Sequence, residues 1–223
     1  MSAPLHIVWD WNGTLLDDTR AALGALNAML ARRSLPAITL ESYRSRFHFP
    51  AREYYDEIGM DIPDAEWDAV AREYHDSYDA ESATAALNPD AVAALELARS
   101  RGARQSILSA LRQDLLEAAV ARFGIADYFD FVRGTDNLDG AGKLSFAREL
   151  KAEIVAADPS ARIVMVGDAI HDHEVASALG VECVLCAQGS HSFERLAALG
   201  SPTAPTLVAA VKLALCSCGG AFD

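Results

Sequence analysis

Five short apolar runs constrain this chain more than any other feature of its sequence. They span residues 5–9, 104–108, 129–133, 163–166 and 181–185. Such runs are typical of strands that are buried on both faces of a parallel sheet. Helix or turn signals follow each run; for example, Leu111, Leu115 and Phe123 share one helical face that ends at Gly124. The alternation predicts an α/β fold with a doubly wound, mostly parallel sheet.

Residues 18–85 break this alternation, because their pattern is helical and contains no strand-like run. Apolar side chains recur at helical spacing in two stretches: Leu23, Leu26 and Leu30, and then Trp67, Val70, Tyr74 and Tyr78. We expect an all-helical domain at 18–85, inserted into an α/β core formed by residues 1–17 and 86–223. Near the end of the core, the two prolines within residues 201–205 predict a surface loop before a last helix.

Acidic residues follow two of the predicted strands. Asp10 comes directly after the first run, and Asp168 and Asp172 follow the fourth run across a tight glycine turn. The carboxyl ends of parallel strands form the crevice in which such sheets bind ligands. Three carboxylates that converge there repel one another unless a hard cation such as Mg²⁺ lies between them. The spacing therefore predicts a magnesium site at this edge.

A hydroxyl and a cation complete the set of predicted site residues. Ser109 ends the second strand at the same edge, and Lys143, one of only three lysines in the chain, precedes a helix. A nucleophilic carboxylate, a metal site, a hydroxyl donor and a lysine together suit attack on a phosphoryl group.

Over nearly its whole length, the chain resembles the haloacid dehalogenase superfamily of aspartate-nucleophile hydrolases. The resemblance rests on four motifs in order: Asp10-Trp11-Asn12-Gly13-Thr14, Ser109, Lys143 and Gly167-Asp168-x-x-x-Asp172. It implies hydrolysis of a small phosphorylated metabolite through an aspartyl-phosphate on Asp10. The implied Mg²⁺ ligands are Asp10, the carbonyl of Asn12, Asp168 and Asp172. The implied phosphate ligands are Thr14, Ser109, the backbone N–H of Ala110, and Lys143.

Spacing also indicates which type of family member this chain resembles. Ninety-nine residues separate Asp10 from Ser109, whereas 34 separate Ser109 from Lys143, so the insertion follows the first strand. This resembles the helical C1-type cap of phosphoglycolate-phosphatase-like and β-phosphoglucomutase-like members, which closes over small metabolites and excludes water. Arg46, His48 and Arg52 surround a turn of this segment, and we expect them to contact the substrate.

Asn12 departs from the family pattern, in which phosphatases carry a second Asp that exchanges protons. An amide forms hydrogen bonds but exchanges no proton. One alternative is therefore a phosphate-binding regulatory or degenerate member with little turnover. A second alternative is a phosphonatase- or dehalogenase-type hydrolase. However, residues 18–85 contain no lysine for a Schiff base, and the Asp168–Asp172 pair suits a metal that dehalogenases do not use.

Charge and cysteine usage limit the expected partners. The formal charge is −13, and a negative field of this size repels nucleic acid and anionic lipid. No run of 18 apolar residues occurs, and the first residues lack the features of a signal peptide. Cys183 and Cys186 lie in an apolar run, and Cys216 and Cys218 form a C-x-C pair, which favours reduced thiols over zinc. We expect a cytoplasmic enzyme, as a monomer or weak homodimer, without nucleic-acid or membrane partners.

Overall fold

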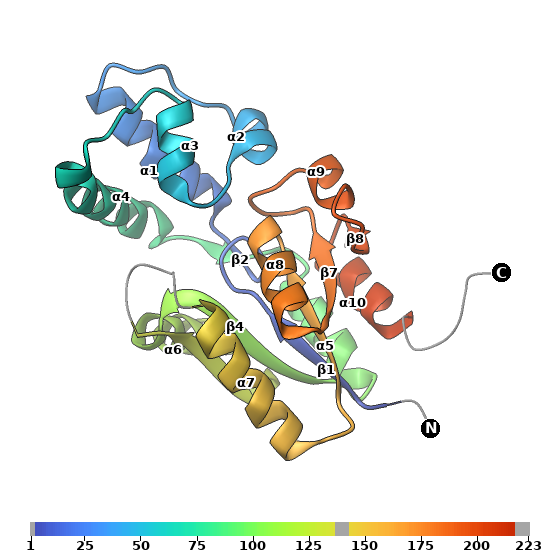
Figure 1. The fold of residues 1–223 in the computed structure, drawn as a ribbon. Coiled ribbons are helices and arrows are strands. Elements are labelled where there is room, and N and C mark those ends of the chain that lie inside the picture. The colour runs from blue at the N-terminus through green and yellow to red at the C-terminus, as the bar shows by residue number, and fades with distance from the viewer. Residues whose placement is uncertain (1–2, 137–142, 217–223) are drawn as a thin grey trace.

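The computed structural model describes residues 3–136 and 143–216 and divides into an α/β core and a helical segment (Figure 1). Six strands of the core form one sheet in the order β5-β4-β1-β6-β7-β8, and every neighbouring pair is parallel. The strands are β1 (Leu5–Trp9), β4 (Arg104–Arg112), β5 (Phe131–Thr135), β6 (Arg162–Gly167), β7 (Glu182–Cys186) and β8 (Thr203–Ala204). The predicted parallel α/β fold is confirmed.

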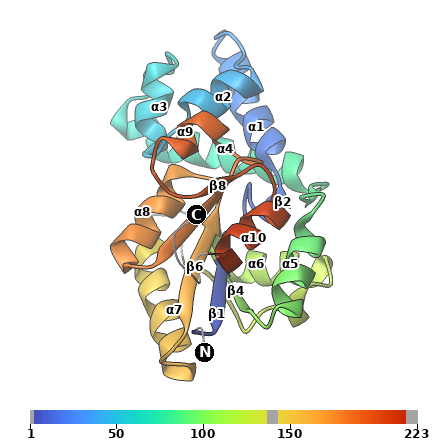
Figure 2. The same cartoon turned by 90° about the vertical axis from the view of Figure 1, so that its right-hand side faces the viewer.

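Helices cover both faces of this sheet, and Figure 2 shows them on the two sides of the upright strands β1 and β6. One face carries α7 (Lys143–Ala157) and α8 (Ile170–Leu179), and the other carries α5 (Ala91–Ser100), α6 (Gln113–Arg122) and α10 (Leu207–Cys216). Strand β1 is buried throughout, and its alternate residues enter different cores: Ile7 and Trp9 face one layer of helices, while Val8 faces the other. Its central place explains why its sequence is continuously apolar.

The inserted segment consists of α1 (Thr19–Arg32), α2 (Leu40–Arg46), α3 (Ala51–Glu57), the short 3₁₀ helix Asp64–Glu66, and α4 (Trp67–Ser82). It has a hydrophobic core of its own, in which Leu26, Met29 and Leu30 pack with Tyr43 and Tyr54. The chain enters this segment through β2 (Leu16–Asp17) and leaves it through β3 (Ala86–Leu87), and the two pair as an antiparallel ribbon. The predicted all-helical insertion is confirmed, and we call it the cap.

Strand β8 corrects the prediction of a surface loop at residues 201–205. Ala204 is only 1% exposed, and its carbonyl accepts a hydrogen bond from the N–H of Ala187 at 2.9 Å. A strand of two residues between prolines carries too little periodicity to be recognised from sequence. The helix α9 (Phe193–Ala197) and a second 3₁₀ helix (Ala126–Tyr128) complete the core.

The structure describes three of the four cysteines and the helices that could be compared with a bilayer in length. Cys183 and Cys186 are free and buried in β7, Cys216 is free and exposed, and Cys218 lies outside the described residues. Within residues 3–136 and 143–216, none of the helices has both the length and the apolar character needed to cross a bilayer.

Candidate active site

The predicted catalytic residues gather at the carboxyl edge of three neighbouring strands. Asp10 follows β1, Ser109 lies in β4 and Asp168 follows β6, and β1 is hydrogen-bonded to both β4 and β6. Carboxylate oxygens of Asp10, Asp168 and Asp172 lie within 4.8 Å of one another, and all three residues are buried. Sheet register thus places residues together that are more than 150 positions apart in sequence.

Lys143 connects two of these carboxylates from the first turn of α7. Its Nζ lies 2.6 Å from Oδ1 of Asp10 and 2.7 Å from Oδ1 of Asp172, and the residue is only 3% exposed. Burial alone lowers the pKa of a lysine, but the two carboxylates outweigh it and hold the pKa of Lys143 above its usual value. The amine is therefore a permanent cation at this site.

The pKa values of the three carboxylates shift in different directions. Burial and the nearby Asp172 charge raise the pKa of Asp10 well above its usual value, and the same causes raise the pKa of Asp168 to about 7. Burial acts on Asp172 in the same direction, but the charge of Lys143 outweighs it and lowers the pKa of Asp172. Three acids thus share one cation, and this excess of negative charge suits a bound divalent cation.

Asp168 is held by loops that follow two different strands. Its Oδ1 accepts a hydrogen bond from the hydroxyl of Thr14 at 3.0 Å, and its Oδ2 accepts one from the N–H of Ser190 at 2.5 Å. A Cβ atom at Gly13 (φ 77°) would lie 2.5 Å from Oδ2, and one at Gly189 would lie 2.1 Å away. Both positions therefore require glycine, so that the backbone approaches the carboxylate closely. We expected Thr14 to contact the phosphate. In the structure its hydroxyl donates the hydrogen bond to Asp168 given above.

Asp172 is fixed by the start of α8. Its Oδ2 accepts hydrogen bonds from the N–H groups of Asp168 and Ala169, both at 3.1 Å, while its Oδ1 faces Lys143. The side chain thus caps the helix and contributes to the acidic cluster at the same time. Hard, preoriented oxygen donors with a net negative charge fit Mg²⁺ rather than a softer metal.

Ser109 lies inside β4, which continues to Arg112. Helix α6 begins only at Gln113, so Leu111, which we expected on this helix, belongs to the strand. Its buried hydroxyl donates to Oδ1 of Asn12 at 3.4 Å and accepts from the N–H of Leu111 at 3.0 Å. The next residue, Ala110, is exposed, and its carbonyl accepts a hydrogen bond from Thr135 at 3.0 Å. The pairing of β4 with β5 is irregular between Leu108 and Arg112, at the place where we expect phosphate.

We expected three cap residues, Arg46, His48 and Arg52, to contact the substrate. In the structure their polar side-chain partners are other residues of the cap. Arg46 and His48 lie 3.8 Å and 3.2 Å from the carboxylate of half-exposed Glu57. Arg52 pairs with Asp64 and donates to the carbonyl of Ile62 at 3.1 Å. Within the described residues, no hydrogen bond or ion pair joins any of the three to the acidic cluster.

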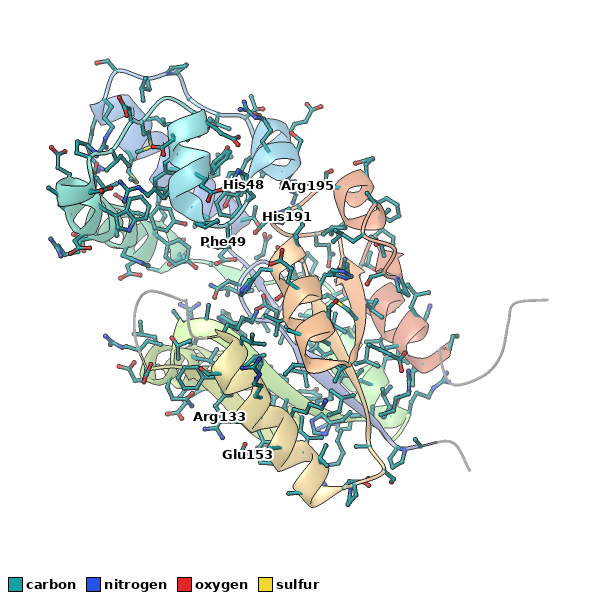
Figure 3. The ribbon with its side chains drawn as sticks, in the orientation of Figure 1. His48, Phe49, Arg133, Glu153, His191 and Arg195 are labelled. Carbon is teal, nitrogen blue, oxygen red and sulfur yellow. The ribbon has the colours of Figure 1, made fainter. Side chains whose placement is uncertain are left out.

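A contact between cap and core that the sequence did not reveal lies at the loop after β7. The Arg44 guanidinium donates to the carbonyls of Gly189 at 2.8 Å and Gln188 at 2.5 Å, and Arg195 of α9 donates to the carbonyl of Phe47. Figure 3 shows His48 and Phe49 of the cap facing His191 and Arg195 of the core. Arginines on an exposed helix are common, so no sequence signal distinguished Arg44.

A second contact that sequence reasoning missed connects the motif-one loop with α4. Asp18, only 4% exposed, accepts hydrogen bonds from the N–H of Gly13 at 2.6 Å, from Nδ2 of Asn12 at 2.8 Å and from the Tyr78 hydroxyl. Burial raises the pKa of Asp18 despite these three donors. The only sequence signal was a second acid directly after Asp17, which also suits the start of a helix.

Comparisons with known proteins agree with this geometry. Phosphoglycolate phosphatases of Caulobacter vibrioides and Neisseria meningitidis are each 28% identical, over 82% and 78% of this chain and 79% and 76% of their own lengths. A haloacid dehalogenase-like family hydrolase from Streptococcus pneumoniae aligns with a TM-score of 0.74 at 16% identity, covering 94% of this chain and 98% of that one. A predicted phosphatase from Clostridium acetobutylicum also gives 0.74, at 18% identity and 96% and 99% coverage.

The family model described as haloacid dehalogenase-like hydrolase matches residues 7–186. That span begins in β1 and ends in β7, so it contains the acidic cluster, Ser109, Lys143 and the whole cap. Both the sheet and the helical insertion recur in the similar structures. The chain therefore belongs to the haloacid dehalogenase-like hydrolases.

Proposed function

We propose that this chain is a Mg²⁺-dependent phosphatase that hydrolyses a small phosphorylated metabolite through an aspartyl-phosphate on Asp10. The observation that supports it most directly is the buried contact of Lys143 with both Asp10 and Asp172. A lysine in this place neutralises a phosphate bound against Asp10, and the acidic cluster offers oxygen ligands to a metal beside it. The names of the sequence relatives agree with this reaction.

Asp10 has one carboxylate oxygen available for the substrate. Among the described residues, its side chain is hydrogen-bonded only through Oδ1, by Lys143. In the proposed reaction Oδ2 attacks phosphorus, and the bond between phosphorus and the leaving oxygen breaks as the bond to Asp10 forms. A water molecule then attacks the same phosphorus, the bond to Asp10 breaks, and inorganic phosphate leaves.

Asn12 limits the proton transfers of this reaction. Its amide takes no proton from the attacking water and gives none to the leaving oxygen. Leaving groups that depart as stable anions therefore suit this site best. Mg²⁺, held by Asp10, the Asn12 carbonyl, Asp168 and Asp172, would supply positive charge beside the phosphoryl oxygens. Ser109 and the N–H of Ala110 would bind the oxygens that face β4.

The cap covers the site in this proposal, and residues 18–85 form the cap domain beside a core of residues 1–17 and 86–223. Arg46, His48 and Arg52 stay our candidates for contact with the non-phosphate end of the substrate. The net charge of −13 supports a role away from nucleic acid and anionic membrane. On this basis we propose a cytoplasmic monomer or weak homodimer.

Phosphate release from p-nitrophenyl phosphate and from a panel of phosphorylated metabolites, with 2-phosphoglycolate first, tests the proposal. We expect turnover of p-nitrophenyl phosphate in millimolar Mg²⁺ and its loss in excess EDTA, because this leaving group needs no proton. Failure to hydrolyse any phosphate ester, with phosphate binding retained, would instead support the regulatory or degenerate alternative. Hydrolysis of a phosphonate or haloacid would support the second alternative.

A further inference from the structure

Asp18 is a buried carboxylate that has no basic partner among the described residues. Its Oδ1 accepts from the N–H of Gly13, while its Oδ2 accepts from the Asn12 amide and from the Tyr78 hydroxyl. A buried carboxylate is costly unless donors surround it. Asn12 and Gly13 belong to the loop that follows the nucleophile, and the hydroxyl of Tyr78 in α4 also accepts from Asn12. The arrangement therefore serves that loop rather than general stability alone.

These contacts fix the orientation of the Asn12 side chain. Its Nδ2 lies 2.8 Å from Oδ2 of Asp18 and 2.9 Å from the hydroxyl of Tyr78, so both amide hydrogens are used. A flipped amide would place the Asn12 oxygen against Oδ2 of Asp18 with no hydrogen between the two acceptors. Oδ1 of Asn12 must therefore point the other way, where Ser109 donates to it at 3.4 Å.

Tyr78 makes this orientation depend on the cap. It lies near the end of α4, and its hydroxyl donates to Asp18 while accepting from Asn12. Asn12 belongs to the core loop, and Asp18 directly precedes α1. The three side chains thus form a closed set of hydrogen bonds from both parts of the molecule, which breaks if α4 moves away.

We propose that Asp18 and Tyr78 are positioning residues for phosphoryl transfer: together they hold the amide oxygen of Asn12 toward the reacting phosphate, and they do so fully only when the cap is closed. This inference rests on the proposed phosphatase function. An oxygen in that place accepts a hydrogen bond from the water that attacks the aspartyl-phosphate, but it gives no proton to the leaving group. It favours substrates with acidic leaving groups, such as aryl or acyl phosphates.

Exchanging the two side chains is the sharpest test. Asn12→Asp alone sets two carboxylates about 3 Å apart, so we expect it to lower both stability and kcat. In the double variant Asn12→Asp/Asp18→Asn, the new amide donates to the new carboxylate and its oxygen still accepts from the N–H of Gly13. The free energies of unfolding, measured by denaturant titration, should therefore be non-additive, with the double variant more stable than Asn12→Asp.

Kinetics separate positioning from mere stabilisation. We expect Asp18→Asn and Tyr78→Phe to lower kcat for p-nitrophenyl phosphate by ~10-fold and ~3-fold, with KM changed less than about twofold. Because the attacking water is mispositioned, Asp18→Asn should also show a pre-steady-state burst of nitrophenolate close to the enzyme concentration. A purely structural role predicts no burst.

Two matched controls carry the same chemical changes outside the set. Asp17→Asn alters the exposed acid beside Asp18, and Tyr74→Phe removes the hydroxyl one turn earlier on α4; both should keep the wild-type kcat. Additive changes in unfolding free energy for the exchange would overturn this inference but not the proposed function. The same holds if Asp18→Asn and Tyr78→Phe keep the wild-type kcat and show no burst. Inactive wild-type protein would overturn the proposed function and the positioning role with it.

Discussion

The acidic cluster of the core and the exposed ends of α2 and α3 in the cap differ in how deeply their charged side chains are buried. In the core, buried Lys143 contacts the buried carboxylates of Asp10 at 2.6 Å and Asp172 at 2.7 Å. In the cap, Arg46 pairs with Glu57 at 3.8 Å and both side chains are about half exposed. Exposed pairs of this kind contribute at most about 1 kcal/mol, whereas removing one partner of a buried pair costs several kcal/mol.

The difference shows which parts of the site are fixed. The core residues are placed by strand pairing, and a change in one leaves an uncompensated buried charge. Arg46 and Glu57 of the cap are half exposed, so we expect this part of the surface to tolerate replacement and to vary with the substrate. We therefore expect substitutions in the acidic cluster to abolish the reaction, and substitutions of Arg46, His48 or Arg52 in the cap to change its selectivity.

The largest expected effect is at Asp10. In Asp10→Asn the carboxylate that we propose as the nucleophile is lost, while size and the hydrogen bond to Lys143 are nearly conserved. We expect kcat for p-nitrophenyl phosphate to fall by at least ~100-fold, since a lost nucleophile has no substitute. Circular dichroism and thermal unfolding serve as the check on folding. Retention of more than about a hundredth of the activity would rule out covalent catalysis by Asp10.

A smaller but pH-dependent effect is expected at Asp168. Its pKa of about 7 in the folded, metal-free protein lies above the unfolded value, so the protonated form favours folding. That contribution is complete at low pH and is lost as the pH rises through about 7. Because Mg²⁺ competes with the proton, its stabilising effect should grow over the same range and reach about 2.7 kcal/mol at a 100-fold excess over its Kd.

Thermal unfolding between pH 5 and pH 8, with and without Mg²⁺, measures this effect. Asp168→Asn has no titrating group at this position and should reduce both the pH dependence and the response to Mg²⁺. Identical Mg²⁺ shifts in the variant and the wild type would show that Asp168 is not a metal ligand.

The smallest effect is expected in the cap. If Arg46, His48 or Arg52 contacts the substrate, its replacement by Ala should raise KM about 10-fold for the best substrate of the panel. KM for p-nitrophenyl phosphate, which lacks the recognised group, should change less than about twofold. Arg32→Ala, which removes another exposed cap arginine paired with Glu73, is the control. Equal losses on both substrates would assign the cap residues a structural role.

Much of the core was predictable because its information is local. An apolar run predicts a strand, and the polar residue after the run predicts a place at the carboxyl edge, so Asp10 and Asp168 could be identified before the strands were paired. Ser109 and Lys143 carry no signal by themselves. They were identified because they occur together with these acids and because the chain resembles a known family. Thr14 was assigned to phosphate, but its contact with Asp168 depends on the path of the loop.

The contacts between cap and core were not predictable in the same way. Asp18 and Tyr78 are 60 residues apart, and no periodicity relates a residue near the end of one helix to the residue before another. Likewise, Arg44 and the loop after β7 meet only because the cap lies over that edge of the sheet. Such pairings follow from how two separately packed units dock, which a single sequence does not encode locally.

The ribbon of β2 and β3 has a consequence for how this molecule diversifies. Asp17 and Ala86 are paired residues, so the chain returns to the core beside the point at which it left. An insertion with adjacent ends can change in length or content without altering the register of the sheet around it. Natural variation or deliberate grafting at this junction can therefore exchange the whole helical unit while the hydrolytic residues keep their places.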